Sequence, residues 1–207
     1  MEEIRIANNT VLSLADILSL AVLEGTAAND QFDGTSAAEI MHGLAGDDIL
    51  SGLDGDDRLA GGLGSDILDG GAGSDTYVFN PGDAQDTIVD GYALDTPAPD
   101  GDTLRITGVS LSDLQFELLS NTIGDDLLVR VGTSGDTILI KEMFNPYDLD
   151  TVQEGIWRIV LDDGTVLHRD EIRERSEIKG TAGSDFIEGT TSDDVIALGP
   201  GGDTATS

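Results

Sequence analysis

The sequence has no cysteine and few basic, aromatic or histidine residues. Its 207 residues include ten Lys and Arg, two His, five Phe, three Tyr and one Trp. Without Cys the chain has neither a disulfide framework nor a thiolate metal site. Two His and no Cys cannot build an ordinary structural zinc site. No apolar run has the length of a membrane span, so we expect no direct membrane insertion.

Acidic residues, in contrast, are abundant and unevenly placed. Forty-one Asp and Glu give a formal net charge of −31, which argues against nucleic acid or an anionic membrane as a direct partner. Residues 25–90 hold thirteen Asp, one Glu and a single base, Arg58. A charge run is usually a solvated surface. These acids, however, are phased with glycine, which a solvating tail does not need, and this phasing predicts bound cations.

A nine-residue period runs through residues 25–78. A glycine opens each unit, at Gly25, Gly34, Gly43, Gly52, Gly61 and Gly70. An acid stands sixth, at Asp30, Glu39, Asp48, Asp57, Asp66 and Asp75. A large apolar residue stands eighth, at Phe32, Met41, Leu50, Leu59, Leu68 and Tyr77. Composition alone does not place three kinds of residue in one register, so this segment is a tandem repeat.

The units at residues 61–69 and 70–78 fit the pattern G-G-x-G-x-D-x-U-x in full. This pattern resembles the haemolysin-type (RTX) nonapeptide, and the resemblance implies a calcium-bound parallel β-roll. Glycines permit a tight turn with inward carbonyls, and the sixth-place carboxylate adds a hard anionic oxygen. We therefore expect an all-β fold: a calcium-bound parallel β-roll followed by an antiparallel β-meander, with short capping helices.

Acids eighteen residues apart should meet on one edge, because two nonapeptides make one turn of a β-roll. The predicted pairs are Asp30 with Asp48, Glu39 with Asp57, Asp48 with Asp66 and Asp57 with Asp75. Turn carbonyls would complete four or more Ca²⁺ sites, and such cages suit Ca²⁺ better than Mg²⁺. We expect the pair with Glu39 to be the weakest. The predicted metal-binding turns also contain Gly43, Gly46, Gly52, Gly55, Gly61, Gly64, Gly70 and Gly73.

The register slips by two residues after Val78, where residues 81–90 repeat the pattern in altered form. A terminal repeat is expected to be atypical because it has no further neighbour. Asp83, Asp86 and Asp90 are therefore candidate capping ligands.

The chain divides into four predicted parts. Residues 1–24 read as a strand plus a capping helix, 25–90 as the roll with its cap, and 91–179 as a β-rich domain resembling the haemolysin-calcium-binding-related domain. Residues 180–207 begin a second, truncated repeat block with candidate ligands Asp185, Asp194 and Asp203. Gly25 and Gly180 lie 155 residues apart, as do other matching residues. We therefore expect residues 1–24 to be the tail of a preceding repeat unit, and the chain to be a fragment or a short member of a long tandem-repeat protein.

The leading functional hypothesis is a calcium-binding structural or interaction module, not an enzyme. The resemblance implies a secreted, extracellular or cell-surface bacterial protein that leaves by type I secretion and folds on extracellular calcium. Its partners would be calcium and neighbouring repeat units, with a protein or polysaccharide partner left open. The alternatives are an accessory module of a polysaccharide-active enzyme similar to mannuronan epimerases, and a receptor-binding segment of an RTX toxin. The two histidines, His42 and His168, do not recur in register with a Ser or an Asp, so we expect neither to be catalytic.

Overall fold

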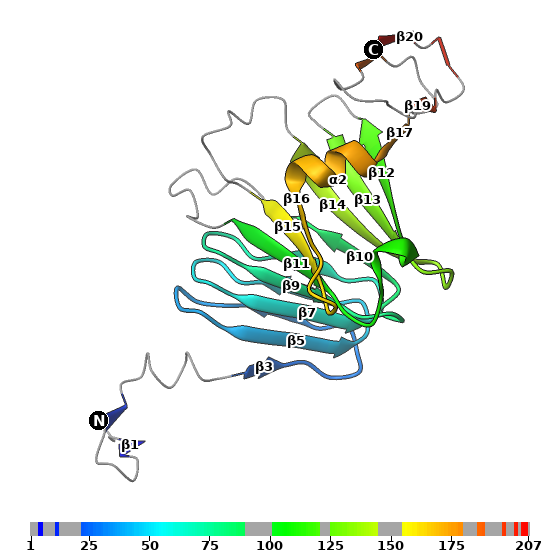
Figure 1. Cartoon of the computed structure of the whole chain (residues 1–207). Helices are drawn as coiled ribbons and strands as arrows, with labels where there is room; N and C mark the ends of the chain where they lie inside the picture. Colours follow the sequence, from blue (N-terminus) through cyan, green and yellow to red (C-terminus); the bar gives the residue numbers. More distant parts are fainter. Residues whose placement is uncertain are drawn as a thin grey trace.

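Strands dominate the computed structural model, which describes residues 4–5, 11–12, 22–89, 101–120, 125–144, 155–179, 186–188, 196–197, 201–202 and 204–206. Two large sheets of nine and seven strands contain most of them (Figure 1). Within these ranges no helix is both long and apolar enough to cross a membrane.

The nonapeptides form a parallel roll whose successive strands alternate between the two sheets. One sheet takes β3 (Val22–Glu24), β5 (Ile40–Ala45), β7 (Arg58–Leu63) and β9 (Thr76–Phe79). The other takes β4 (Gln31–Asp33), β6 (Ile49–Ser51), β8 (Ile67–Asp69) and β10 (Gln85–Ile88). Met41 pairs with Leu59 and Leu50 with Leu68, each eighteen residues on. The predicted parallel roll is confirmed.

The eighth residue of each unit points between the sheets, because side chains alternate along a strand. Met41, Leu50, Leu59, Leu68 and Tyr77 are at most 2% exposed. The corresponding residues of the first turn, Leu23 and Phe32, are only partly buried against this core. A first turn has one stacked neighbour instead of two, so its core residues keep part of their surface in water.

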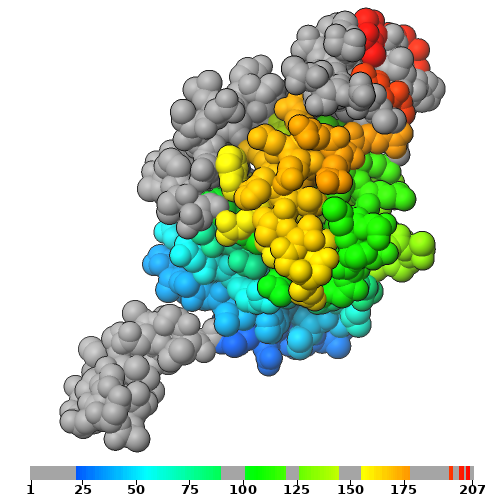
Figure 2. Space-filling view, in the orientation of Figure 1, coloured from blue at the N-terminus to red at the C-terminus, as the bar shows by residue number. Residues whose placement is uncertain are grey.

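Both roll sheets continue into the second half of the chain. In the seven-stranded sheet, β11 (Asp102–Ile106) pairs in parallel with β9 and with β15 (Ile156–Leu161). In the nine-stranded sheet, β10 pairs in parallel with β14 (Asp136–Phe144). Figure 2 shows the blue-to-cyan roll and the green and yellow strands in one continuous body. A single hydrophobic core runs through both.

The antiparallel meander lies in the nine-stranded sheet. It consists of β12 (Leu114–Ser120), β13 (Asp125–Val131) and β14, paired in that order. A second antiparallel pair, β15 with β16 (Val166–His168), ends the other sheet. A short 3₁₀ turn, η1 (Leu111–Asp113), precedes β12. Helix α2 (Arg169–Arg175) follows β16 and buries Ile172, and His168 occupies its N-cap.

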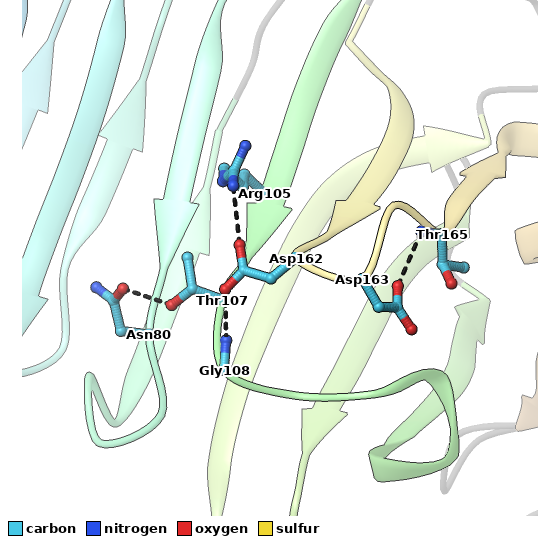
Figure 3. Close-up of polar contacts among 7 residues, drawn as sticks. All are labelled: Asn80, Arg105, Thr107, Gly108, Asp162, Asp163 and Thr165. Atoms are coloured by element: carbon cyan, nitrogen blue, oxygen red, sulfur yellow. Dashed lines mark hydrogen bonds and ion pairs between the residues drawn. The ribbon is translucent and has the colours of Figure 1, made fainter.

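Asp162, in the turn between β15 and β16, ties three strands at one end of the seven-stranded sheet (Figure 3). Its carboxylate accepts hydrogen bonds from the Arg105 guanidinium at 2.8 Å and from the Gly108 backbone N–H at 3.0 Å. Beside it the Thr107 hydroxyl donates to Asn80 at 2.7 Å, joining the ends of β11 and β9. The nonapeptide array and the β-rich region that follows it are therefore linked by side chains as well as by strand pairing.

Short strands complete the described structure. They are β1 (Ile4–Arg5), β2 (Val11–Leu12), β17 (Glu177–Lys179), β18 (Phe186–Glu188), β19 (Ile196–Ala197) and β20 (Thr204–Thr206). β17 pairs in parallel with β12, and β19 with β17. Phe186 pairs with Thr204, which repeats the eighteen-residue spacing of the roll. The capping helix predicted within residues 1–24 lies outside the described residues.

Candidate metal centre

Each edge of the roll carries a ladder of acidic side chains. The backbone N–H of a sixth-place acid donates to the carboxylate oxygen Oδ1 of the acid eighteen residues later. The donor–acceptor pairs are Asp30 to Asp48 at 2.7 Å, Glu39 to Asp57 at 2.7 Å, Asp48 to Asp66 at 2.8 Å and Asp57 to Asp75 at 2.7 Å. The structure thus brings together the acid pairs that the spacing predicted.

The second carboxylate oxygen of these acids is buried. Asp48, Asp57 and Asp66 are 1–2% exposed, and their Oδ2 atoms have no hydrogen-bond partner. A buried, unsatisfied anionic oxygen is costly, so several in a row require compensation by a cation or a proton. These orphaned oxygens fit a hard divalent cation, whose preferred ligands are carboxylate and carbonyl oxygens.

First-place glycines make room for these oxygens. A Cβ atom built on Gly43, Gly52 or Gly61 would lie 2.1–2.3 Å from the Oδ2 of the acid in the same unit. No such contact is possible for a real side chain, so glycine is required at this place by the carboxylate itself. Gly70 stands in the same relation to Asp75.

The fourth-place glycines shape the turn backbone. Gly46, Gly55, Gly64 and Gly73 have φ between 114° and 146°, which side-chain-bearing residues rarely adopt. Successive turns stack so closely that a Cβ on Gly64 would lie 2.0 Å from the Gly46 carbonyl oxygen. A Cβ on Gly43 would lie 2.5 Å from the Gly61 carbonyl oxygen as well as 2.3 Å from Oδ2 of Asp48, so turn carbonyl oxygens lie beside the acids. Since no three acidic or histidine side chains of the described residues group as a metal site, backbone oxygens would have to complete the coordination.

The ladder ends differently on the two edges. On one edge the N–H of Asp66 donates to Asp86, twenty residues later, at 3.1 Å, which confirms the two-residue slip of register. Asp83 is buried beside it and accepts hydrogen bonds from the backbone and side chain of Asn80. The other candidates, Asp90, Asp185, Asp194 and Asp203, lie outside the described residues.

On the other edge the sequence analysis missed Asp102. The N–H of Asp75 donates to its Oδ1 at 2.7 Å, so Asp102 takes the place of the next sixth-place acid. The available signal was local: Asp102-Thr103-Leu104 repeats the acid-x-apolar end of a nonapeptide, as in Asp75-Thr76-Tyr77. The eighteen-residue spacing could not reveal it, because that spacing points from Asp75 to Ala93, whereas Asp102 follows Asp75 by 27 residues.

The sequence analysis also missed a second, outer ladder, which the side chains at the fifth place of the units form. Asp47 and Asp56, each one residue before a sixth-place acid, accept hydrogen bonds at 2.9 Å from the backbone N–H groups of Ser65 and Ser74. The N–H of Asp47 in turn donates to Asn29 at 3.0 Å. Fifth-place side chains therefore tie successive turns together.

Burial gives the ladder unusual acid–base properties. Desolvation raises the pKa of Asp57 and of Asp66 from 3.8 to about 6, opposed by the backbone hydrogen bond that each accepts. It raises the pKa of Asp86 to about 8, with further contributions from Asp66, Asp83 and Asp136. The pKa of Asp83 is also raised, mainly by burial. Crowded buried carboxylates thus hold protons tightly when no cation neutralises them.

Comparison with known proteins agrees with this geometry. The family model described as the RTX calcium-binding nonapeptide repeat matches four stretches, residues 22–50, 42–77, 51–86 and 177–205. No curated protein matches the sequence. Among solved structures, the chain is similar to the solution structure of the AlgE6R3 subunit from the Azotobacter vinelandii mannuronan C5-epimerase. The identity is 24%, with 56% of this chain and 72% of that chain covered and a TM-score of 0.40.

Proposed function

We propose that the chain, whose residues 22–86 and 177–205 match the family model of the RTX calcium-binding nonapeptide repeat, is a structural module that folds when it binds extracellular calcium. The ladder acids and the turn glycines of residues 25–90 would hold the ions. The described part of that set comprises Asp30, Glu39, Asp48, Asp57, Asp66, Asp75, Asp83 and Asp86, with the turns at Gly43, Gly46, Gly52, Gly55, Gly61, Gly64, Gly70 and Gly73. Asp102 joins them as a ladder acid.

The buried, unpartnered Oδ2 atoms of Asp48, Asp57 and Asp66 carry the proposal. A carboxylate without a partner in a protein interior destabilises the fold, whereas bound Ca²⁺ supplies the missing positive charge. Two contacts determine where that charge is needed. The Oδ1 atom of each of these acids accepts a hydrogen bond from a backbone N–H of the neighbouring turn, and the first-place glycine leaves Oδ2 open to the turn carbonyls.

Charge repulsion explains why folding would depend on the ion. The chain has a formal net charge of −31, and Arg58 is the single base among residues 25–90. Without a counter-ion the stacked acids repel one another, which favours an expanded chain. Such a chain could pass a secretion channel in the calcium-poor cytosol and then fold outside the cell.

The free energy of calcium binding is large enough to drive the folding of such a module. A site with a dissociation constant of about 0.1 mM, facing about 1 mM calcium, stabilises the folded state by about 1.4 kcal/mol. Four such sites would contribute about 6 kcal/mol, which is comparable with the whole stability of a small domain.

A calcium titration followed by far-ultraviolet circular dichroism tests the proposal. We expect a cooperative gain of β signal with a midpoint between tens of micromolar and about 1 mM, reversed by a chelator. Magnesium at the same concentrations serves as the control and should give a smaller change, because Mg²⁺ demands a stricter octahedron and holds its water. A spectrum that stays the same after chelation would exclude calcium-dependent folding.

A further inference from the structure

The first two turns of the array differ from the later ones at the residue after the opening glycine. Thr26 and Thr35 stand there in the first two units, followed by Leu44, Leu53, Gly62 and Gly71 in the next four. In the later turns this residue has a positive φ of 77–101°. Neither threonine has a positive φ, and neither has Ala28 or Ala37, which replace the fourth-place glycine. The array thus contains two kinds of turn.

The threonine turns satisfy their own acid. Thr26 donates to Oδ2 of Asp30 twice, from its backbone N–H at 2.6 Å and from its hydroxyl at 2.9 Å. Thr35 donates to both carboxylate oxygens of Glu39, from its N–H to Oε2 at 3.0 Å and from its hydroxyl to Oε1 at 2.5 Å. The corresponding oxygens of Asp48, Asp57 and Asp66 have no partner.

The threonine hydroxyl also closes the turn. Oγ1 of Thr26 accepts a hydrogen bond from the N–H of Ala28, and Oγ1 of Thr35 from that of Ala37, both at 3.2 Å. A hydroxyl that donates to the acid and accepts from the backbone two residues later replaces the open glycine turn by a compact one. In these two turns the oxygen that would face a cation is already hydrogen-bonded.

We infer that Thr26 and Thr35 keep the first two turns free of calcium, so that ion binding begins at the glycine turns that follow. This inference rests on the proposed calcium-binding function. The Asp48–Asp66 and Asp57–Asp75 pairs are the sites flanked by glycine turns on both sides. The inference narrows the proposed set of ion-holding acids to the later ones. Asp30 and Glu39 instead serve as hydrogen-bond acceptors that start the stack, although the eighteen-residue spacing by itself makes them equivalent to the other acids.

The position of these turns gives the physical reason. Among the described residues the first turn on each edge has a stacked neighbour on one side alone, so its acid lacks the backbone N–H that an earlier turn donates to each later acid. A hydroxyl and a backbone N–H of the same unit neutralise the acid locally and need no earlier turn. The second array begins in the same way, with Gly180-Thr181 and Gly189-Thr190. Two threonine units therefore open both arrays.

A matched pair of isosteric substitutions tests the inference in the full chain. Asp30→Asn keeps the acceptor for Thr26 and should leave unchanged the number of calcium ions bound per chain, measured by native mass spectrometry and calorimetric titration. Asp66→Asn, on the same edge, should lower that number by at least one. Loss of an ion in Asp30→Asn would overturn the inference. A wild-type chain that binds no calcium would instead refute the proposed function.

A second variant tests the role of threonine directly. The double substitution Thr26→Gly with Ala28→Gly gives the first unit the sequence Gly-Gly-Ala-Gly-Asn-Asp, which matches the glycine turns. We expect this variant to bind one more calcium ion than the wild type, between Asp30 and Asp48. Thr26→Ser, which keeps the hydroxyl, should behave as the wild type. An unchanged ion count in the double variant would show that threonine does not exclude the ion.

Discussion

The backbone N–H of Asp75 donates a 2.7 Å hydrogen bond to the carboxylate of Asp102, which lies 27 residues further along the chain. Asp75 belongs to the last regular nonapeptide, whereas Asp102 begins β11 in the β-rich region after the array. One edge of the acid ladder therefore ends on a residue outside the array. The stability of the roll depends at this point on the strand that this β-rich region provides.

Asp102→Ala should destabilise the calcium-loaded protein by about 1–3 kcal/mol, because the buried N–H of Asp75 loses its acceptor. Urea unfolding in saturating calcium measures this loss. Glu174→Ala, at an exposed position of α2, removes the same charge and should change the unfolding free energy by less than about 0.5 kcal/mol. Equal effects of both substitutions would mean that net charge, and not the hydrogen bond, determines the result.

The stability of the calcium-free protein should fall as the pH rises from about 4 to about 8. Burial raises the pKa of Asp57 and Asp66 to about 6 and that of Asp86 to about 8, from 3.8 in the unfolded chain. The folded state therefore binds these protons more tightly than the unfolded state. Their contribution to stability is complete below pH 3.8 and is lost as the pH passes through 6 and then 8.

The far-ultraviolet circular dichroism signal of the chelated protein at pH 5 and pH 8 tests this sign, because protonated ladder acids should retain more β structure at pH 5. The lowered pKa values of Asp162 and Asp163 act in the opposite direction but below pH 3.8, outside this window. Because calcium and protons compete for the same carboxylates, the calcium midpoint should also decrease between pH 5 and pH 8. More β signal in the chelated protein at pH 8 than at pH 5 would contradict the burial of unneutralised acids.

Leu44→Gly and Leu53→Gly should stabilise the protein slightly. Both leucines have a positive φ, 78° and 77°, at the place where later units carry glycine, and both are nearly half exposed. A non-glycine residue in this conformation costs at least about 1 kcal/mol, while glycine costs about 0.5–1 kcal/mol of backbone entropy. We expect a gain of up to about 1 kcal/mol in thermal unfolding with calcium. Leu63→Gly, at an exposed position with no positive φ, is the control and should destabilise.

Asp57→Ala should raise the calcium midpoint several-fold. The substitution removes the acceptor of the Glu39 N–H and one carboxylate of the pair with Asp75. The measurement is a circular dichroism titration. Asp54→Ala, in the same unit but exposed, should leave the midpoint within about twofold. If both substitutions shift the midpoint equally, the buried ladder is not the source of calcium affinity.

Deletion of residues 180–207 should leave the calcium transition nearly intact. Three nonapeptides offer little stacked core, and an isolated solenoid segment of that length does not hold itself together. β19 pairs with β17, but β17 remains paired with β12 after the deletion. Loss of the transition in the shortened chain would show that the two arrays form one cooperative unit.

The sequence by itself determined the roll. A nine-residue period fixes which residues turn, which bind and which point inward, because each contact joins residues eighteen apart and repeats along the array. The pairing of Met41 with Leu59 in the core and of Asp48 with Asp66 on the edge therefore followed from this spacing together with the β-roll that the nonapeptide resemblance implies. The predicted slip of register before Asp86 also followed from the local pattern.

Tertiary structure decided how the array ends and how its two kinds of turn differ. Asp102 reaches the ladder because β11 pairs with β9 across a long connection, and no local period encodes a pairing of that range. The role of Thr26 depends on whether its hydroxyl reaches Asp30, which is set by the φ of the turn and not by the residue spacing. Repeated local contacts can be predicted from sequence, whereas single long-range contacts depend on the packing of the whole molecule.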